Sequence, residues 1–382
     1  MKNILLAAAT ALVTLLVALL ALRRLAPTLV GEPVEVRIVQ SSEQVPPFYE
    51  HVFASTGIGE RLPDPVTGVR ERGLRVEGGG RGPHDLLGFR NHAVPNVTSV
   101  VAIGDSQTYG AGARYLETWP RQLQGLLGLP DLSVYSMACG GWGPAAYLAM
   151  ARVAGGLRPR AVVVAYYTGN DPHDAFSQAY MSPLWSELRV NPRLGPADMP
   201  KATGPAPWRQ TWKARFGDGY APAFTPEYRL VANNRSKPGV LEGYAIIAKS
   251  AALIARALEG EHTRVFFTVI PTKELVYAQR VRAEGLKPPA AYEQLVRDEA
   301  VNIAELARAL AAVRRTRYVD VLTPLQQAAR RGARLYRSDS DGHPAALGYT
   351  TIGKAIADAI RQAVAGAADE RADGEASLPR DP

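Results

Sequence analysis

Three short polar blocks in this chain carry the residue types that acyl transfer from an ester needs. The tripeptide GDS at 104–106 follows one apolar run, GND at 169–171 follows another, and DGH at 341–343 lies near the C-terminal end. A serine hydroxyl is a weak nucleophile, so it needs a base, most often histidine, to take its proton. It also needs hydrogen-bond donors for the oxyanion that develops on the carbonyl oxygen. The blocks supply a hydroxyl, an amide and an imidazole, if the fold brings them together.

Short apolar runs alternate with amphipathic stretches from residue 99 onward. The runs that predict buried strands cover residues 99–103, 132–137, 160–167, 264–271 and 317–322. The stretches that predict helices cover residues 119–127, 147–154, 241–258, 292–313 and 348–364. This alternation predicts an α/β fold, in which helices cover both faces of a parallel sheet. Because ligands bind beyond the carboxyl ends of such strands, we expect Ser106 and Asn170 at the ligand-binding edge.

The blocks GDSQT at 104–108, GND at 169–171 and DGHP at 341–344 resemble, in this order, the motifs of the GDSL/SGNH hydrolase superfamily. The resemblance implies a three-layer α/β/α, flavodoxin-like parallel sheet over residues 99–365. Residues 172–242, with many prolines and aromatic side chains, match no motif and are expected to form an insertion. The acyl chemistry of such a site needs neither a metal nor a cofactor, so none is expected.

The resemblance also implies the roles of particular residues. Ser106 corresponds to the nucleophile, and its backbone N–H is the first oxyanion donor. The backbone N–H of Gly141, in the block SMACGGWG at 136–143, is the second donor, and the side-chain amide of Asn170 is the third. This block begins with serine where the family commonly has asparagine. Among the six histidines only His343 has a family-like setting, and it is the predicted base.

The acid that would orient the histidine has two candidates. Simple members of the superfamily carry aspartate three residues before the histidine, and that position is Ser340 here. Asp341 stands two residues before His343, and Asp339 stands four before it. The Asp-x-His order resembles the membrane-anchored branch related to alginate O-acetyltransferases, and this favours Asp341. Three flanking segments are similar to that branch: LGFR at 87–90, ETWP at 117–120 and IPTKELVY at 270–277.

Other reactive or aromatic side chains receive structural interpretations. Lys273 and Glu274 are predicted to form a surface pair, and Cys139 to be a small buried packing residue. His173 is expected on the surface or in a loop, with a place in the pocket as the alternative. Three tryptophans of the insertion are expected in the core, with stacking on sugar rings as the alternative: Trp185, Trp208 and Trp212.

An uncharged apolar segment runs from Ile4 to Leu22, close to the roughly 20 residues that a helix needs to cross a membrane. No convincing cleavage site follows, so residues 1–24 are predicted to be an uncleaved signal anchor. This transmembrane helix would hold the catalytic domain at the inner membrane, in the periplasm or exterior; a cleaved signal and a secreted protein is the alternative. Positive charges on both sides of the segment leave its orientation open. Residues 25–98 are predicted to be membrane-proximal, and residues 366–382 to be a disordered tail.

The composition limits the class of protein and of partner. The 382 residues are 47% apolar and 21% charged, which is typical of a globular protein with a sizeable core. The net charge is +8, but there is no zinc-finger spacing and no dense Lys/Arg block, so a nucleic-acid partner is not expected. The single cysteine excludes an intrachain disulfide.

Together these features predict a membrane-anchored serine esterase. Its expected substrates are ester groups, above all O-acetyl groups, of a carbohydrate or cell-surface polysaccharide. A polysaccharide O-acyltransferase that uses the same residues is one alternative. A lipolytic esterase is another, and it predicts turnover that rises with acyl-chain length. The alternative from a different class is a non-catalytic, membrane-tethered protein that binds or assembles carbohydrate.

Overall fold

The computed structural model describes residues 38–39, 61–64, 68–71, 81–131, 133–201, 207–259 and 263–376. The predicted membrane segment at 4–22 lies outside these residues. The chain divides into two compact units, and the unit Val36–Ala359 contains the whole central sheet.

The central sheet has five parallel strands in the order β11-β10-β7-β5-β6. Their bounds are Val100–Gly104 for β5, Val134–Ala138 for β6, Ala161–Tyr167 for β7, Arg264–Ile270 for β10 and Thr316–Val319 for β11. Every residue of β5, β6 and β7 is buried, as the apolar runs predict. The strand order reverses between β5 and β7, which is the flavodoxin-like order, and such a reversal opens a crevice for ligands at the carboxyl ends.

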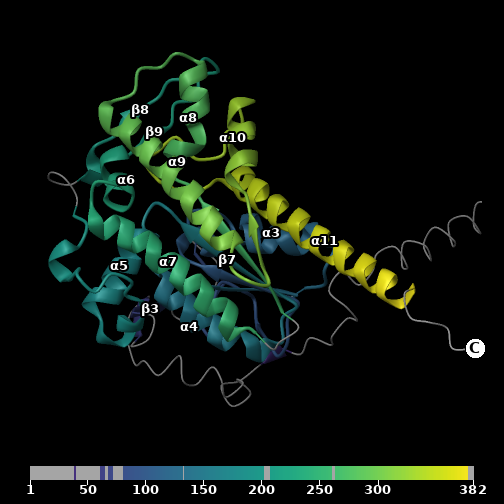
Figure 1. The fold of residues 1–382 in the computed structure, drawn as a ribbon. Helices are drawn as coiled ribbons and strands as arrows, with labels where there is room; N and C mark the ends of the chain where they lie inside the picture. The colour runs from purple at the N-terminus through teal and green to yellow at the C-terminus, as the bar shows by residue number, and fades with distance from the viewer. Residues whose placement is uncertain are drawn as a thin grey trace, which may run out of the picture. The chain divides into compact units, whose positions relative to one another are not determined.

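Helices cover both faces of this sheet (Figure 1). The helices α4 and α9 contact the sheet on one side, with α7 packed against both; α3 contacts β6, and Gly353 of α11 lies against the backbone of α3. The bounds are Trp119–Leu126 for α3, Pro144–Ala154 for α4, Pro238–Ala257 for α7, Ala290–Ala311 for α9 and Ala346–Ala376 for α11. The parallel sheet flanked by helices is therefore confirmed.

Among the described residues, one helix, α7, is long and apolar enough to cross a membrane. However, 56% of its apolar window is buried inside the protein. A helix that covers a sheet is expected to be apolar in this way, because one of its faces belongs to the core.

Further short elements lie between these helices and strands. The helices are Ser106–Tyr109 (α2), Asp171–Met181 (α5), Pro226–Asn233 (α6), Lys273–Ala283 (α8) and Leu322–Arg330 (α10). The 3₁₀ turns are Tyr115–Glu117 (η3), Gly155–Leu157 (η4), Pro183–Leu188 (η5), Pro196–Asp198 (η6) and Pro207–Arg209 (η7). The antiparallel pairs are Ile38–Val39 (β1) with Val94–Pro95 (β4), Arg61–Asp64 (β2) with Gly68–Glu71 (β3), and Trp212–Lys213 (β8) with Ala223–Phe224 (β9).

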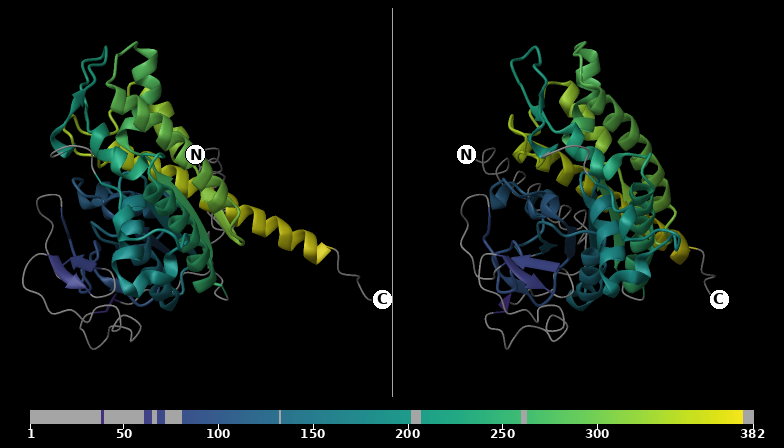
Figure 2. Two further views of the ribbon diagram at one scale, coloured as in Figure 1. Left: turned by 60° about the vertical axis from the view of Figure 1, so that its left-hand side comes forward. Right: turned by 90° about the vertical axis from the view of Figure 1, so that its left-hand side faces the viewer.

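The region 172–242, expected as an insertion, is built mostly of these short elements. It contains most of α5, the turns η5 to η7, the β8–β9 hairpin and α6. Figure 2 shows the teal hairpin beside the green helices α8 and α9, where Trp212 packs on Tyr292 with ring centroids 4.9 Å apart. No long hydrophobic period marks this region, because its elements are too short to have one.

The end of α11 differs from the prediction. We expected the helix to end near Val364 and a disordered tail to begin at residue 366, but α11 continues to Ala376. Residues 366–376 include four alanines, two glutamates and one arginine, which are strong helix formers. Their intrinsic propensity outweighs the two glycines at 366 and 374.

Candidate active site

The strand-to-helix turn after β5 presents the Ser106 hydroxyl. Asp105 caps the short helix α2, and its Oδ1 accepts a hydrogen bond from the Gln107 N–H at 2.8 Å. The turn is tight: a Cβ on Gly104 would lie 2.1 Å from the Thr108 Oγ1. Only glycine allows the backbone to pass this close to Thr108 and the Ala165 carbonyl, and the Ser106 side chain that follows is partly exposed.

His343 bridges Ser106 and Asp341. Its Nε2 lies 2.8 Å from Ser106 Oγ, and its Nδ1 lies 2.6 Å from Asp341 Oδ1, although 237 positions separate the serine from the histidine. A carboxylate can only accept, so Nδ1 carries the proton and Nε2 accepts from the serine hydroxyl. Asp339, the other candidate acid, pairs instead with Arg337 at 2.7 Å.

The Asp341 carboxylate is held in its charged form. Burial raises its pKa, but hydrogen bonds from His343 and the charge of that imidazole lower the pKa to about 2. The carboxylate is therefore ionised at neutral pH. A charge at this place stabilises the imidazolium that forms whenever Nε2 takes a proton.

Lys273 supports the loop that carries Asp341. It is the first residue of α8, only 1% exposed, and its Nζ donates to the carbonyl oxygens of Asp339 and Asp341 at 2.8 and 2.9 Å. Burial lowers the pKa of Lys273 to about 8. Glu274 is also 1% exposed and accepts a hydrogen bond from the Thr225 N–H. The predicted surface pair is therefore wrong, because α8 starts beneath the loop and the insertion covers it.

The two other residues predicted as oxyanion donors, Gly141 and Asn170, line the same cavity as Ser106. Gly141, in the loop after β6, has a φ of 85°, a conformation that favours glycine, and it lines the same cavity as Ser106. Asn170 follows β7 and also lines the cavity. Its Nδ2 donates to Asp174 Oδ2 at 2.6 Å, and the other oxygen of Asp174 lies 3.3 Å from His173 Nδ1.

Buried carboxylates lie around the strand ends. Burial raises the pKa of Asp105 to about 6, and burial together with Asp105 raises the pKa of Asp171. Both oxygens of Asp171 accept from the Tyr147 hydroxyl. Hydrogen bonds therefore fix the positions of these groups, as buried polar groups require.

Glu299 joins the ends of two strands. Its Oε1 accepts from the Thr168 hydroxyl at 2.5 Å and from the Thr272 N–H at 2.8 Å, just after β7 and β10, and its Oε2 accepts from the Thr272 hydroxyl. Burial raises the pKa of Glu299 to about 7. The carboxyl group lies far along the chain from both threonines, and no sequence motif marked it.

A cavity of about 760 Å³ opens over Ser106 and His343. Much of its wall comes from the insertion, through Met199, Pro200, Lys201, Trp208, Tyr228 and Arg229. His173 lines it too, which was the alternative for that residue. Trp208 is 57% exposed, unlike the core residue that we expected, because its 3₁₀ turn lies at the surface.

The remaining tryptophans and the cysteine are packed. Trp185 is 6% exposed, and Trp212 stacks on Phe224 with centroids 5.6 Å apart. Cys139 is buried, as predicted.

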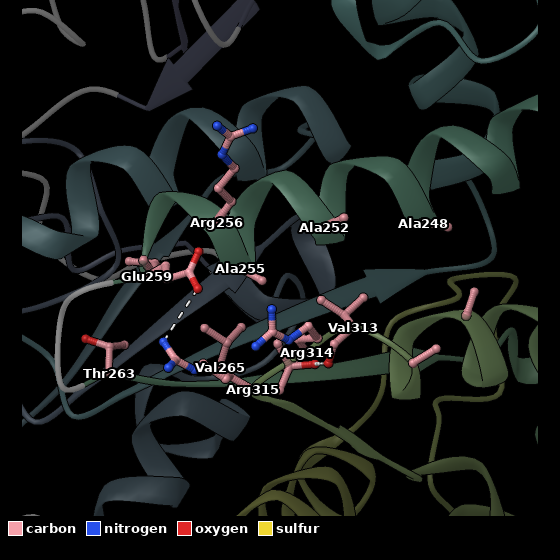
Figure 3. A pocket seen from close by; sticks show the side chains of 14 residues that line it. Ala248, Ala252, Ala255, Arg256, Glu259, Thr263, Val265, Val313, Arg314 and Arg315 are labelled. Carbon is pink, nitrogen blue, oxygen red and sulfur yellow. Dashed lines mark hydrogen bonds and ion pairs between the residues drawn. The ribbon is translucent and has the colours of Figure 1, made fainter.

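A second cavity, of about 500 Å³, lies where α7 and α9 end and β10 and β11 begin (Figure 3). Arg256, Arg314 and Arg315 line it, and Arg315 is 3.5 Å from Glu259. Its lining residues include no histidine, and it lies at the amino ends of the strands, away from the usual ligand edge. In the described part of the chain, no cluster of acidic, histidine or cysteine side chains could hold a metal ion.

Residues 102–351 match the model of the GDSL-like lipase/acylhydrolase family. The chain belongs to this family. It is therefore an SGNH-type ester hydrolase, and the fold and the serine–histidine geometry agree with that membership. The comparison with curated proteins gives no match. The resemblance to the alginate O-acetyltransferase branch stays a prediction.

Solved structures are similar to this hydrolase at low identity. A Bacteroides fragilis protein described as an acylhydrolase is 14% identical over 70% of this chain and 88% of its own, with a TM-score of 0.35. A catalytic mutant of Axe2, an acetylxylan esterase from Geobacillus stearothermophilus, is 12% identical over 69% and 96%, also with a TM-score of 0.35. TesA is 16% identical over 68% and 96%, with a TM-score of 0.36. At these scores the likeness carries no argument about function.

Proposed function

We propose that this hydrolase removes short acyl groups, above all O-acetyl groups, from a carbohydrate through a covalent intermediate on Ser106. The observation that carries the proposal is the continuous hydrogen-bond chain from Asp341 through His343 to the serine hydroxyl. A nucleophile, a base and a group that orients the base are the parts that acyl-enzyme catalysis needs.

In the first step, Ser106 Oγ attacks the ester carbonyl while His343 Nε2 takes its proton. The negative charge that develops on the carbonyl oxygen is stabilised by the backbone N–H groups of Ser106 and Gly141 and by the Asn170 amide. That amide has two hydrogens; one bonds Asp174, and the 3.5 Å contact with Asp171 is weak enough to be exchanged for the oxyanion. His343 then gives its proton to the leaving alcohol, and the acyl group stays on Ser106.

In the second step, water replaces the alcohol. His343 takes a proton from the water as its oxygen attacks the acyl carbonyl. The bond from the carbonyl carbon to Ser106 Oγ breaks, the proton returns to the serine, and the carboxylic acid leaves. Throughout, Asp341 keeps the proton on Nδ1 and stabilises the charged ring.

The aromatic side chains of the cavity support a sugar as the alcohol part of the substrate. Trp208 and Tyr228 are 57% and 38% exposed, and both line the cavity over the nucleophile. Exposed aromatic rings provide flat apolar faces at low entropic cost, and the apolar face of a sugar ring fits against them. We also propose that the segment 4–22 holds the enzyme at the inner membrane with its cavity outside the cytoplasm, because of its length and lack of charge.

The test uses the full chain in detergent with 4-nitrophenyl acetate and acetylated xylo-oligosaccharides. We expect Ser106→Ala to lower kcat about a thousandfold or more. Ser186→Ala, an exposed serine outside the cavity, should keep the wild-type rate. Rapid acid quenching and peptide mass analysis should find the acetyl group on Ser106. Equal rates for wild type and Ser106→Ala would refute the serine route.

Two further readouts separate the alternatives. If an added oligosaccharide becomes acetylated and free acetate does not appear, the enzyme is a transferase. If kcat/KM rises from acetate to octanoate esters, the lipolytic interpretation replaces ours.

A further inference from the structure

Arg229 lies in the wall of the active-site cavity. Burial alone would lower its pKa, but charges that include Glu274 and Glu299 raise it from a distance, and neither glutamate forms an ion pair with it in the described part of the chain. It belongs to α6, and its guanidinium carbon is 5.6 Å from the Tyr167 ring centre and 4.9 Å from that of Tyr228. Among the described residues no carboxylate lies within ion-pair distance of it. The acidic residue in the cavity lining, Asp174, is already bound by Asn170 and His173.

The hydrogen-bonding groups around Arg229 are incompletely satisfied. Its Nε is buried and has no partner in the described part of the chain, and Nη1 reaches the Gly169 carbonyl only at 3.5 Å. The hydroxyl of Tyr167, a residue 2% exposed, is also buried and has no hydrogen-bond partner among the residues that the structure describes. Native proteins rarely leave such groups unpaired, and a water or an anion bound beside them would satisfy both donors.

Both groups lie next to the loop that carries the base. A Cβ on Gly342, between Asp341 and His343, would be 2.4 Å from Arg229 Nη2 and 3.1 Å from the Tyr167 hydroxyl. The planar guanidinium of Arg229, which lies near the rings of Tyr167 and Tyr228, is therefore within a few ångströms of the loop backbone at His343. Lys201 adds a second positive charge to the same cavity.

We propose that Arg229, assisted by the Tyr167 hydroxyl, binds a carboxylate on the ester substrate. A guanidinium fork matches a carboxylate in shape and charge, and a phenol can donate to the same group. This inference rests on the proposed ester hydrolysis. The carboxylate belongs either to the alcohol part, which the proposed function takes to be a sugar, or to the acyl part. In both cases the substrate is an anionic ester.

The kinetic test compares matched esters. For the alcohol part the pair is 4-acetoxybenzoate and its methyl ester, and for the acyl part it is mono-4-nitrophenyl succinate and 4-nitrophenyl butyrate. For each pair we take the kcat/KM of the anionic ester divided by the kcat/KM of the neutral ester. In one of the pairs, Arg229→Gln should lower this ratio about 10- to 100-fold relative to wild type. The pair that responds identifies the part that carries the carboxylate.

The ratio separates recognition from a structural role. If Arg229 only supported the loop, Arg229→Gln would lower kcat/KM equally for both esters of a pair, and the ratio would stay unchanged. Arg229→Lys should keep part of the preference, because it retains the charge without the fork. Arg193→Gln removes the same charge at an exposed position outside the cavity and should leave the ratio at its wild-type value.

A binding measurement tests the subsite without turnover. Calorimetry with the full-length Ser106→Ala protein compares 4-acetamidobenzoate and mono-anilide succinate with their methyl esters. One acid should bind about tenfold or more tightly than its ester, and Arg229→Gln in the same background should remove the difference. Equal binding of acids and esters, or a kinetic ratio unchanged by Arg229→Gln, overturns the anion subsite. Absence of turnover in wild type alongside preferential acid binding would instead refute the proposed hydrolysis and keep the subsite.

Discussion

The two sides of the cavity are built in different ways. On one side, Ser106 and Asn170 follow β5 and β7, whose residues are all buried and whose backbones pair in parallel register across the sheet. On the other side, the wall consists of residues 199–201, the turn η7 and the short helix α6, and the two aromatic side chains that it places in the cavity, Trp208 and Tyr228, are exposed. We call these the strand-end side and the insertion wall.

This difference separates reaction from recognition. The strand-end side fixes atoms within hydrogen-bonding distance of one another, as a nucleophile and its base require. The insertion wall offers rings and charges on elements whose sequence can change without disturbing the sheet. Changes on the strand-end side should therefore affect kcat, whereas changes in the wall should affect KM and the choice of substrate.

The largest expected effect separates two neighbouring aspartates on the strand-end side. In Asp341→Asn, the amide would present an N–H to His343 Nδ1, which forces the proton onto Nε2 and removes the base. We expect kcat for 4-nitrophenyl acetate to fall about a thousandfold or more. Asp339→Asn removes the exposed ion pair with Arg337, while the asparagine oxygen can still accept from the Asp341 N–H, so kcat should change by less than about threefold.

The measurement is steady-state kinetics of both variants at pH 7, with thermal unfolding as the check on folding. A large loss in Asp339→Asn together with a small one in Asp341→Asn would reverse the assignment of the acid. Similar small losses in both would mean that His343 acts without a carboxylate partner.

The second prediction concerns Glu299, which joins the ends of β7 and β10. Its pKa rises from 4.5 to about 7 on folding, because it is buried. The folded chain then holds the proton more tightly than the unfolded chain. The free energy of unfolding therefore falls as pH rises from about 4.5 to about 7, by roughly 2–3 kcal/mol for this group. Glu299→Gln removes the titration.

We therefore expect Glu299→Gln to gain stability relative to wild type between pH 5 and pH 8, as measured by urea unfolding. Glu305→Gln is the matched control, since it changes an exposed carboxylate of the same helix, paired with Arg235. Its stability relative to wild type should change by less than about 1 kcal/mol over that range. If the free energy of unfolding changes with pH in the same way in the two variants, the Glu299 carboxyl between the strand ends does not titrate in this range.

The same contrast explains what could be predicted from the sequence. The strands could be predicted because each is a short apolar run, and Ser106 and His343 could be proposed because their motifs are local. The choice between Asp341 and Asp339 depends on the direction of the loop, which spacing alone leaves open. The buried position of Lys273 depends on contacts with the distant loop at 339–341, and no periodicity records such contacts.

The insertion wall shows the same limit more strongly. Trp208 and Trp185 belong to one proline-rich stretch without a hydrophobic period, so the sequence predicts a core position for both alike. This prediction is confirmed for Trp185 and wrong for Trp208. The exposure of each ring depends on which side of its 3₁₀ turn meets the rest of the fold, and this is decided by tertiary packing.

The smallest expected effect is that of Trp208, and Trp185 is its packed counterpart. Trp208→Ala removes an exposed ring from the cavity, so KM for acetylated oligosaccharides should rise about tenfold while the thermal midpoint stays near that of wild type. Trp185→Ala empties a packed site and should lower the free energy of unfolding by about 3 kcal/mol. A fall in stability for Trp208→Ala with no change in KM would show that its ring supports the wall rather than the substrate. Recognition would then have to come from Tyr228 and the charged groups beside it.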